Sequence, residues 1–233
     1  MVQDKSAVRN AATVIVLRDR HTQPRILMGQ RGAKAAFMPN KFVFPGGAVD
    51  AADADVHLGQ DLPAMCHDRL SEDIIVAPIT PQALAAAAIR ELWEETGQVL
   101  GVAGEWPDAP EDWQGFAALG QRPNAAPLQF VFRALTPPGR PRRFDARFFL
   151  VDADELSTDP DDFSAASDEL SHLQWVDLNE ARAFDMPFIT EVVLSEVQAR
   201  ARSTEPPASV PFFKNNEEYN LFLRLRGHPP TDD

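Results

Sequence analysis

Three glutamates that lie close together in the sequence could hold a divalent cation. If their segment is an α-helix, Glu91, Glu94 and Glu95 fall within an arc of roughly 100°. Like charges four positions apart destabilise a helix by roughly 0.2–0.5 kcal/mol, and carboxylates near its C-terminus oppose the helix dipole. Mg²⁺ takes hard oxygen ligands, commonly a few carboxylates together with substrate phosphates. The cluster therefore favours a cation site beside a diphosphate, and its simpler alternative is a solvated acidic face.

The helix that would carry these glutamates has clear start and stop signals. Thr80 and Pro81 are typical of an N-cap and a first helical position, and Gly97 is typical of a helix end. The run between them is rich in alanine, and apolar residues such as Ile89 and Leu92 form an arc beside the acidic one. We expect one face of this helix to pack inward while the neighbouring face presents the carboxylates.

The other expected elements are strands mixed with helices. Strands are expected at 11–17, 25–29, 41–44, 128–135, 143–151 and 173–176, and helices around Trp113, near 178–180, at 188–202 and at 217–226. The first two strands should form a hairpin, and Pro45-Gly46-Gly47 should end the third. Strands and helices do not alternate strictly, which predicts an α+β sandwich.

One segment interrupts this pattern. Residues 51–80 are rich in Ala, Asp and His and show little periodicity, apart from a brief extended piece at 74–79. We interpret the segment as an irregular insertion. The prediction is a single domain over residues 1–233, with this insertion at about 51–80 and a helical C-terminal extension at about 187–233.

Composition limits the partners and the compartment. The formal net charge of −13 disfavours long nucleic acid and anionic membranes, whereas a bound cation could still attract a small anionic substrate. The single cysteine, Cys66, fits a reducing compartment, and the sequence has no apolar run long enough to span a bilayer. We expect a cytoplasmic protein that could take a small anionic substrate, and a homodimer stays open.

The glutamate helix and the upstream glycines resemble the signature of the Nudix hydrolases, G-x5-E-x7-R-E-U-x-E-E-x-G-U. The matching residues are Gly47 and the stretch Arg90-Glu91-Leu92-Trp93-Glu94-Glu95-Thr96-Gly97. Gln98 stands where the signature has an apolar residue. Gly47 and Arg90 lie 43 positions apart where the signature has 14, so 29 residues are inserted. The signature also has an isolated glutamate between Gly47 and Arg90. Its spacing from Gly47 leads to Asp53, its spacing from Arg90 leads to Gln82, and both residues stay open.

The resemblance implies a fold and a reaction. The fold would be a Nudix-type α/β/α sandwich with a mixed sheet, and the reaction would be metal-dependent hydrolysis of a pyrophosphate link. Mg²⁺ or Mn²⁺ would bind Glu91, Glu94 and Glu95, with Glu169 as a further candidate ligand from a downstream loop. Glu91 is the first choice for a general base, and Arg90 would orient a glutamate by a charge-assisted bond.

Further fragments resemble the coenzyme A diphosphatase branch, in which an insertion also interrupts the signature. They are Phe37-Met38-Pro39, Val43-Phe44-Pro45-Gly46-Gly47, Asp50-Ala51-Ala52-Asp53 and Arg143-Phe144-Asp145. The branch's recognition pattern is met only in part, because Gly29, Gly32, Ala36 and Asn40 depart from it. The substrate-binding residues implied by the resemblance are Arg31, Phe44, Gly46, Gly47 and Arg143.

Two alternatives to a coenzyme A or acyl-coenzyme A substrate stay open. The same chemistry could act on ADP-ribose or an NADH-like dinucleotide. The domain could also bind a nucleotide without cleaving it and act as a sensor.

Overall fold

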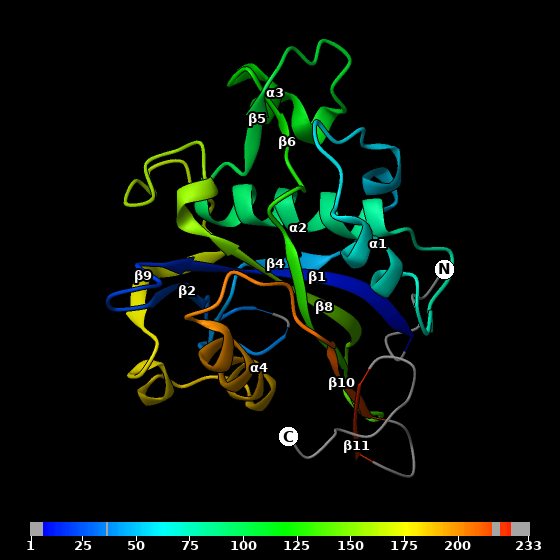
Figure 1. Ribbon diagram of the computed structural model, residues 1–233, viewed down its shortest axis with the longest axis vertical. Coiled ribbons are helices and arrows are strands. Elements are labelled where there is room, and N and C mark those ends of the chain that lie inside the picture. Colours follow the sequence, from blue (N-terminus) through cyan, green and yellow to red (C-terminus); the bar gives the residue numbers. More distant parts are fainter. Residues whose placement is uncertain (1–6, 36, 216–219, 225–233) are drawn as a thin grey trace.

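The computed structural model describes residues 7–35, 37–215 and 220–224, and within them nine strands form one mixed sheet. The sheet order is β11-β10-β7-β8-β1-β2-β3, with β4 paired to β1 and β9 paired to β2. The strands are β1 (Val8–Arg18), β2 (Arg25–Arg31), β3 (Phe42–Val43), β4 (Gly46–Ala48), β7 (Gln129–Leu135), β8 (Arg143–Asp152), β9 (Leu170–Asp177), β10 (Pro211–Asn215) and β11 (Asn220–Arg224). The predicted β1–β2 hairpin is confirmed, and β1 also runs parallel to β8 (Figure 1).

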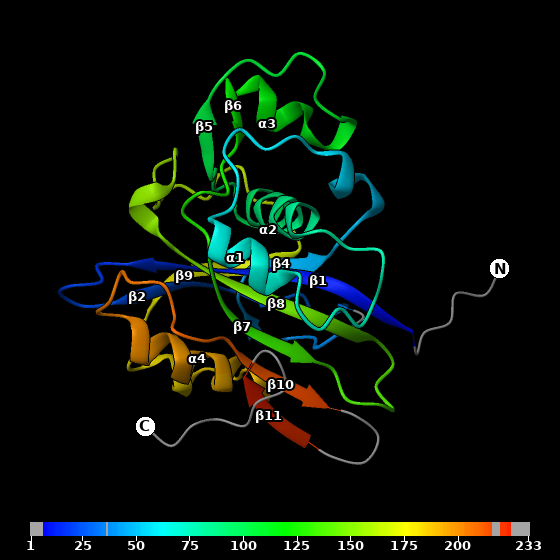
Figure 2. The same ribbon diagram turned by 45° about the vertical axis from the view of Figure 1, so that its right-hand side comes forward.

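Alternate residues of β1 face opposite sides of the sheet, and helices cover both sides. Val14 and Val16 belong to a core cluster on the side of α2 (Pro81–Thr96). Ile15 belongs to the cluster on the side of α4 (Phe188–Arg200). Figure 2 shows the sheet between these two helices. The predicted α+β class and α/β/α sandwich are therefore confirmed.

Helix α2 has the predicted start and end. The Thr80 hydroxyl accepts a hydrogen bond from the Ala83 N–H at 3.1 Å, Pro81 occupies the first helical position, and Gly97 ends the helix with a φ of 74°. Ala85 to Ala88 and Ile89 are fully buried, and these five consecutive residues go all the way round the helix, so this part of α2 is enclosed on every side. No helix in the described ranges is both long and apolar enough to cross a bilayer.

A small cap lies over α2 on the side away from the sheet. Its elements are β5 (Gly101–Ala103), η2 (Glu111–Trp113), α3 (Gln114–Ala118) and β6 (Gln121–Pro123). Trp93 of α2 and Phe116 of the cap meet edge to face with ring centroids 5.7 Å apart. The short helical segment predicted around Trp113 is confirmed, whereas three-residue strands leave no periodic pattern by which to predict them.

The insertion at 51–80 has more structure than its composition predicts. It contains the short helices η1 (Ala51–Asp55) and α1 (Ala64–Leu70), and the extended piece expected at 74–79 consists of bends and coil instead. Helix α1 buries Cys66 and Leu70. Seven residues are too few for a helical pattern to be distinguished from an irregular one.

The C-terminal prediction was wrong in part. Helix α4 agrees with the helix expected at 188–202, but only the single turn η4 (Ala181–Ala183) forms near 178–180. The helix expected at 217–226 is contradicted where the structure describes it, because β11 pairs antiparallel with β10, which pairs parallel with β7. The extension thus adds strands to the sheet edge, and the rest of that predicted helix lies outside the described residues.

A buried group of charges joins the insertion to the sheet. Asp145 on β8 is fully buried and accepts two hydrogen bonds from Arg133 on β7, at 2.8 and 2.7 Å. Arg147 lies 3.2 Å from the same carboxylate, and burial lowers the pKa of its guanidinium to about 10. Arg133 also donates to the carbonyl oxygens of Glu72 and Asp73, at 3.1 and 2.8 Å. These bonds hold the end of the insertion against the sheet.

We predict that Asp145→Asn lowers the free energy of unfolding by about 3–5 kcal/mol, because two buried guanidinium groups lose the carboxylate they share. Equilibrium unfolding in urea measures the change. Asp154→Asn on η3 (Ala153–Glu155) removes an exposed carboxylate and serves as the control. A loss no larger than that of the control would contradict the prediction.

Candidate active site

Two glycines of β4 let carboxylates from α2 reach the sheet. A Cβ atom on Gly47 would lie 2.4–2.5 Å from the carboxylate atoms of Glu91. The Gly46 N–H donates to Glu95 Oε2 at 2.7 Å. A Cβ on Gly46, whose φ is 155°, would lie 2.6 Å from the Ala12 carbonyl oxygen. Both glycines, expected to bind substrate, are therefore placed where they position glutamates.

The Arg90 guanidinium is the centre of a buried ion network. Its Nε and Nη2 donate to the two carboxylate oxygens of Asp53 at 3.0 and 3.1 Å. Its Nη1 donates to Glu91 Oε1 and to Glu94 Oε2, both at 2.9 Å. Nη2 also donates to the Ala48 carbonyl oxygen at 3.1 Å. The orienting role predicted for Arg90 requires charge-assisted bonds of this kind to the glutamates.

Burial and mutual repulsion raise the pKa values of all three glutamates. Burial raises the pKa of Glu91 to about 7, although the charge of Arg90 opposes the rise. Burial and the charge of Glu91 raise the pKa of Glu95 to about 8. Burial also raises the pKa of Glu94, against the opposing charge of Arg90. The site therefore holds more carboxylates than its arginine neutralises.

Two residues predicted from separate segments lie near these glutamates. Glu169, in the exposed loop before β9, raises the pKa values of Glu91, Glu94 and Glu95 through its charge. The charge of Arg31, at the end of β2, lowers the pKa of Glu95. The Arg31 Nε is buried and has no hydrogen-bond partner among the described residues. The charge of Arg31 thus acts on the glutamate site, while its Nε is enclosed by protein atoms.

Two other residues predicted as substrate contacts make contacts within the protein. Phe44 is 4% exposed and packs in the core cluster on the side of α4. Arg143 begins β8, and its Nε donates to the Thr136 carbonyl oxygen at 3.2 Å. Its neighbour Phe144 meets Phe37 edge to face, with ring centroids 5.4 Å apart. Phe44 therefore supports the core, and Arg143 fastens the hairpin between β7 and β8.

The donor set fits a hard divalent cation in its chemistry. Among the described residues, no three acidic, histidine or cysteine side chains already stand in a metal-binding arrangement. Glu91 and Glu94 are instead bonded to Arg90. Carboxylate oxygens are the ligands that Mg²⁺ and Mn²⁺ prefer. Burial is the main cause of the raised pKa values, and a cation bound beside the carboxylates would favour their charged form. Binding would exchange part of the Arg90 contacts for the cation.

Comparisons with known proteins agree with this geometry. Residues 81–196 match the family model described as the NUDIX domain. The chain contains a Nudix domain. It is 30% identical over 188 residues to the protein named "Putative nudix hydrolase 7" of Caenorhabditis elegans, covering 75% of this chain and 53% of that protein. The chain therefore spans about half the length of this curated relative.

A solved structure supports the same Nudix fold. The crystal structure of a NUDIX hydrolase from Alicyclobacillus acidocaldarius matches with a TM-score of 0.62 and 25% sequence identity. The match covers 85% of this chain and 94% of that chain. The Nudix-type sandwich is thus shown over most of the chain.

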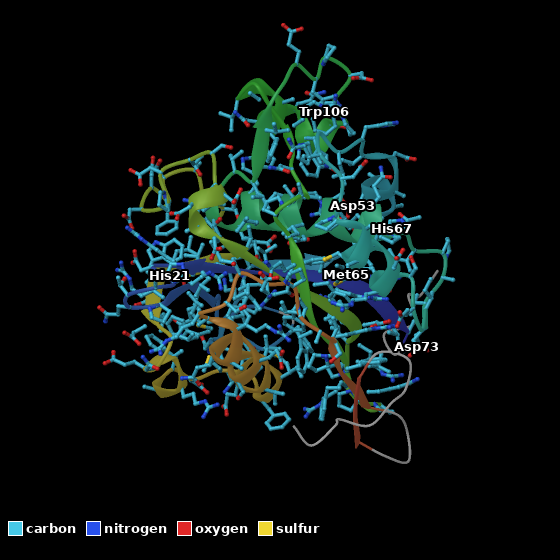
Figure 3. The ribbon with its side chains drawn as sticks, viewed as in Figure 1. His21, Asp53, Met65, His67, Asp73 and Trp106 are labelled. Atoms are coloured by element: carbon cyan, nitrogen blue, oxygen red, sulfur yellow. The ribbon has the colours of Figure 1, made fainter. Side chains whose placement is uncertain are left out.

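The structure identifies Asp53 as the residue at the position of the isolated glutamate in the Nudix signature. Asp53 is 1% exposed and pairs with Arg90, whereas Gln82 donates to a backbone carbonyl of the insertion. Figure 3 shows Asp53 beside α2. Its place six residues after Gly47 is the sequence signal that identifies it. The 29 extra residues therefore follow Asp53 and leave the first half of the signature continuous.

We predict that Gly47→Ala weakens Mn²⁺ binding by about 10- to 100-fold, because the new Cβ displaces the Glu91 carboxylate. The free energy of unfolding should change by less than about 1 kcal/mol, since the clashing atoms end a flexible side chain. Isothermal titration calorimetry and urea unfolding measure the two effects. Gly32→Ala is the control, because nothing lies within 4 Å of its added Cβ. Unchanged Mn²⁺ affinity would refute the positioning role of Gly47.

Proposed function

We propose that this chain is a metal-dependent diphosphatase that hydrolyses the pyrophosphate link of a nucleoside diphosphate derivative. This proposal is supported above all by the buried and half-buried carboxylates that surround Arg90, because one guanidinium group cannot neutralise all of them. Mg²⁺ or Mn²⁺ would bind Glu91, Glu94 and Glu95, with Glu169 as a further ligand. The bound cation would lower the pKa of a coordinated water and stabilise charge on the phosphate oxygens.

Each residue of the site has a distinct task in this proposal. Glu91 would accept the proton of the attacking water or share the cation. Glu95 is fixed by the Gly46 N–H, so its carboxylate would bind with little loss of side-chain freedom. Arg90 orients Glu91 and is a positioning residue. Arg31 would bind a phosphate oxygen of the substrate through its guanidinium group.

Coenzyme A or an acyl-coenzyme A is the proposed substrate. Support comes from the sequence fragments shared with that branch, and two of them meet in space through Phe37 and Phe144. Cleavage of coenzyme A would give phosphopantetheine and an adenosine bisphosphate. ADP-ribose and NADH-like dinucleotides are the alternatives with the same chemistry. The complete set of three glutamates favours catalysis over a sensor that only binds nucleotide.

The proposal also covers the compartment, the kind of partner and the domain organisation, for which composition and sequence pattern give the support. We propose that the chain acts in the cytoplasm on a small nucleotide and not on long nucleic acid. We also propose that residues 1–233 form one Nudix domain in which about 51–80 is an insertion. A monomer and a homodimer are both compatible with the proposal.

The proposal predicts turnover that depends on both metal and glutamates. With Mg²⁺, the protein should release a monophosphate product from coenzyme A or an acyl-coenzyme A in preference to ADP-ribose and NADH. Glu94→Gln and Glu95→Gln should each lower kcat by about 10²- to 10⁴-fold. Chromatographic separation of the products measures the rates, and EDTA should abolish them.

Glu155→Gln is the matched control, because Glu155 is an exposed carboxylate on η3. No turnover of any compound in the panel would refute the enzyme proposal. Cleavage of ADP-ribose without cleavage of coenzyme A would refute only the substrate.

A further inference from the structure

Gln98 is a buried polar residue at the signature position that is usually apolar. Its side chain is fully buried at the end of α2, directly after Gly97. Its Nε2 donates to the carbonyl oxygens of Asp159 and Asp162 at 3.2 and 2.9 Å, and its Oε1 accepts from the Thr158 hydroxyl at 2.8 Å. A buried amide with both of its ends bonded to one loop is a specific contact, because an apolar residue could make none of these bonds.

The loop that Gln98 holds runs from 157 to 169 and ends at Glu169. Backbone bonds continue the attachment, since the Ser157 N–H donates to the Val99 carbonyl oxygen at 2.8 Å and the Ser167 N–H donates to the Glu94 carbonyl oxygen at 3.0 Å. The loop also packs against the C-terminal glycine of α2, where an added Cβ would lie 3.0 Å from Ala165. Figures 1 and 2 both show this yellow-green loop at the C-terminal end of α2.

The loop therefore delivers Glu169 to the glutamate cluster. Ser167, which bonds to the Glu94 backbone, stands two residues before Glu169, and its hydroxyl accepts from the Glu169 N–H at 3.4 Å. The charge of Glu169 acts on all three glutamates of α2. A carboxylate on an exposed loop needs such fixed attachments, because a mobile ligand would lose conformational freedom on binding a cation.

We propose that Gln98 is a positioning residue that fastens the 157–169 loop to the end of α2 and so holds Glu169 beside the metal-binding glutamates. The inference rests on the proposed diphosphatase function for the role of Glu169, but the attachment itself does not depend on it. The departure of this chain from the Nudix signature is then a functional adaptation of the same site.

Hydrogen exchange tests the attachment without any substrate or metal. Gln98→Leu restores the apolar residue of the signature and removes all three side-chain bonds. The loop amides at 157–169 should exchange at least about 10-fold faster, while the amides of α2 keep their rates. Thr158→Val is a second variant. It removes the bond that the Thr158 hydroxyl donates to Gln98 and the one that it accepts from the Val99 N–H, and it keeps both bonds of the Gln98 Nε2, so it should also raise the exchange of the loop amides. Gln198→Leu, the same change at an exposed site on α4, is the control and should leave the loop unchanged.

A double-mutant cycle on Mn²⁺ affinity tests the link to Glu169. Gln98→Leu and Glu169→Gln should each raise the Mn²⁺ dissociation constant about 10-fold, and the double variant should be no weaker than either single one. Unchanged loop exchange would overturn the attachment. Multiplied effects in the double variant, or a wild-type protein that binds no Mn²⁺, would overturn the positioning of Glu169. If the loop exchange and the Mn²⁺ coupling are as expected but no compound is turned over, the diphosphatase proposal is refuted and the positioning role of Gln98 stands.

Discussion

One buried guanidinium group is shared among more carboxylates than it can neutralise. Arg90 is 5% exposed and pairs with Asp53, Glu91 and Glu94, while Glu95 lies buried alongside. With every carboxylate ionised, the group would carry net negative charge in a place with little water, which is costly unless protons or a further cation neutralise it. This constraint explains why the glutamate pKa values rise and why the site is suited to a divalent ion beside a diphosphate.

The surrounding elements keep this arrangement in place. The glycines of β4 allow the glutamates to approach the sheet, and Asp53 comes from η1 at the start of the insertion. The far end of the insertion is held to the sheet by Arg133 through the carbonyl oxygens of residues 72 and 73. Asp53, the partner of Arg90, lies directly before the 29 extra residues, and Arg133 fastens their far part to the sheet, so the order of this segment and the order of the site are connected.

The sequence predicts those parts of the molecule that depend on local signals. Helix α2 is one such part, because Thr80, Pro81 and Gly97 define its ends without help from distant residues. Asp53 was left open because a short acidic residue replaces the expected glutamate and 29 inserted residues disturb the counting.

Other predictions failed because they depend on long-range contacts. Strand β11 was expected to be a helix, and it forms a strand because β10 is paired to β7 and provides an edge. The resemblance to the coenzyme A diphosphatase branch implied Phe44 as a substrate contact, and its packing in the core on the side of α4 could be found only in the structure. In the sequence, Gln98 is only a departure from the signature, and its bonds to the 157–169 loop can be seen only in the structure.

The central claim is that Arg90 and Asp53 act as one unit that positions the glutamates. A double-mutant cycle on kcat/KM, with Mg²⁺ and the best substrate, tests it most directly. Arg90→Lys and Asp53→Asn should each lower kcat/KM by about 10²-fold, because neither variant keeps the paired hydrogen bonds between guanidinium and carboxylate. The kcat/KM of the double variant should be about equal to that of the less active single variant. Losses that multiply to about 10⁴-fold would show that the two residues act independently and would contradict the account.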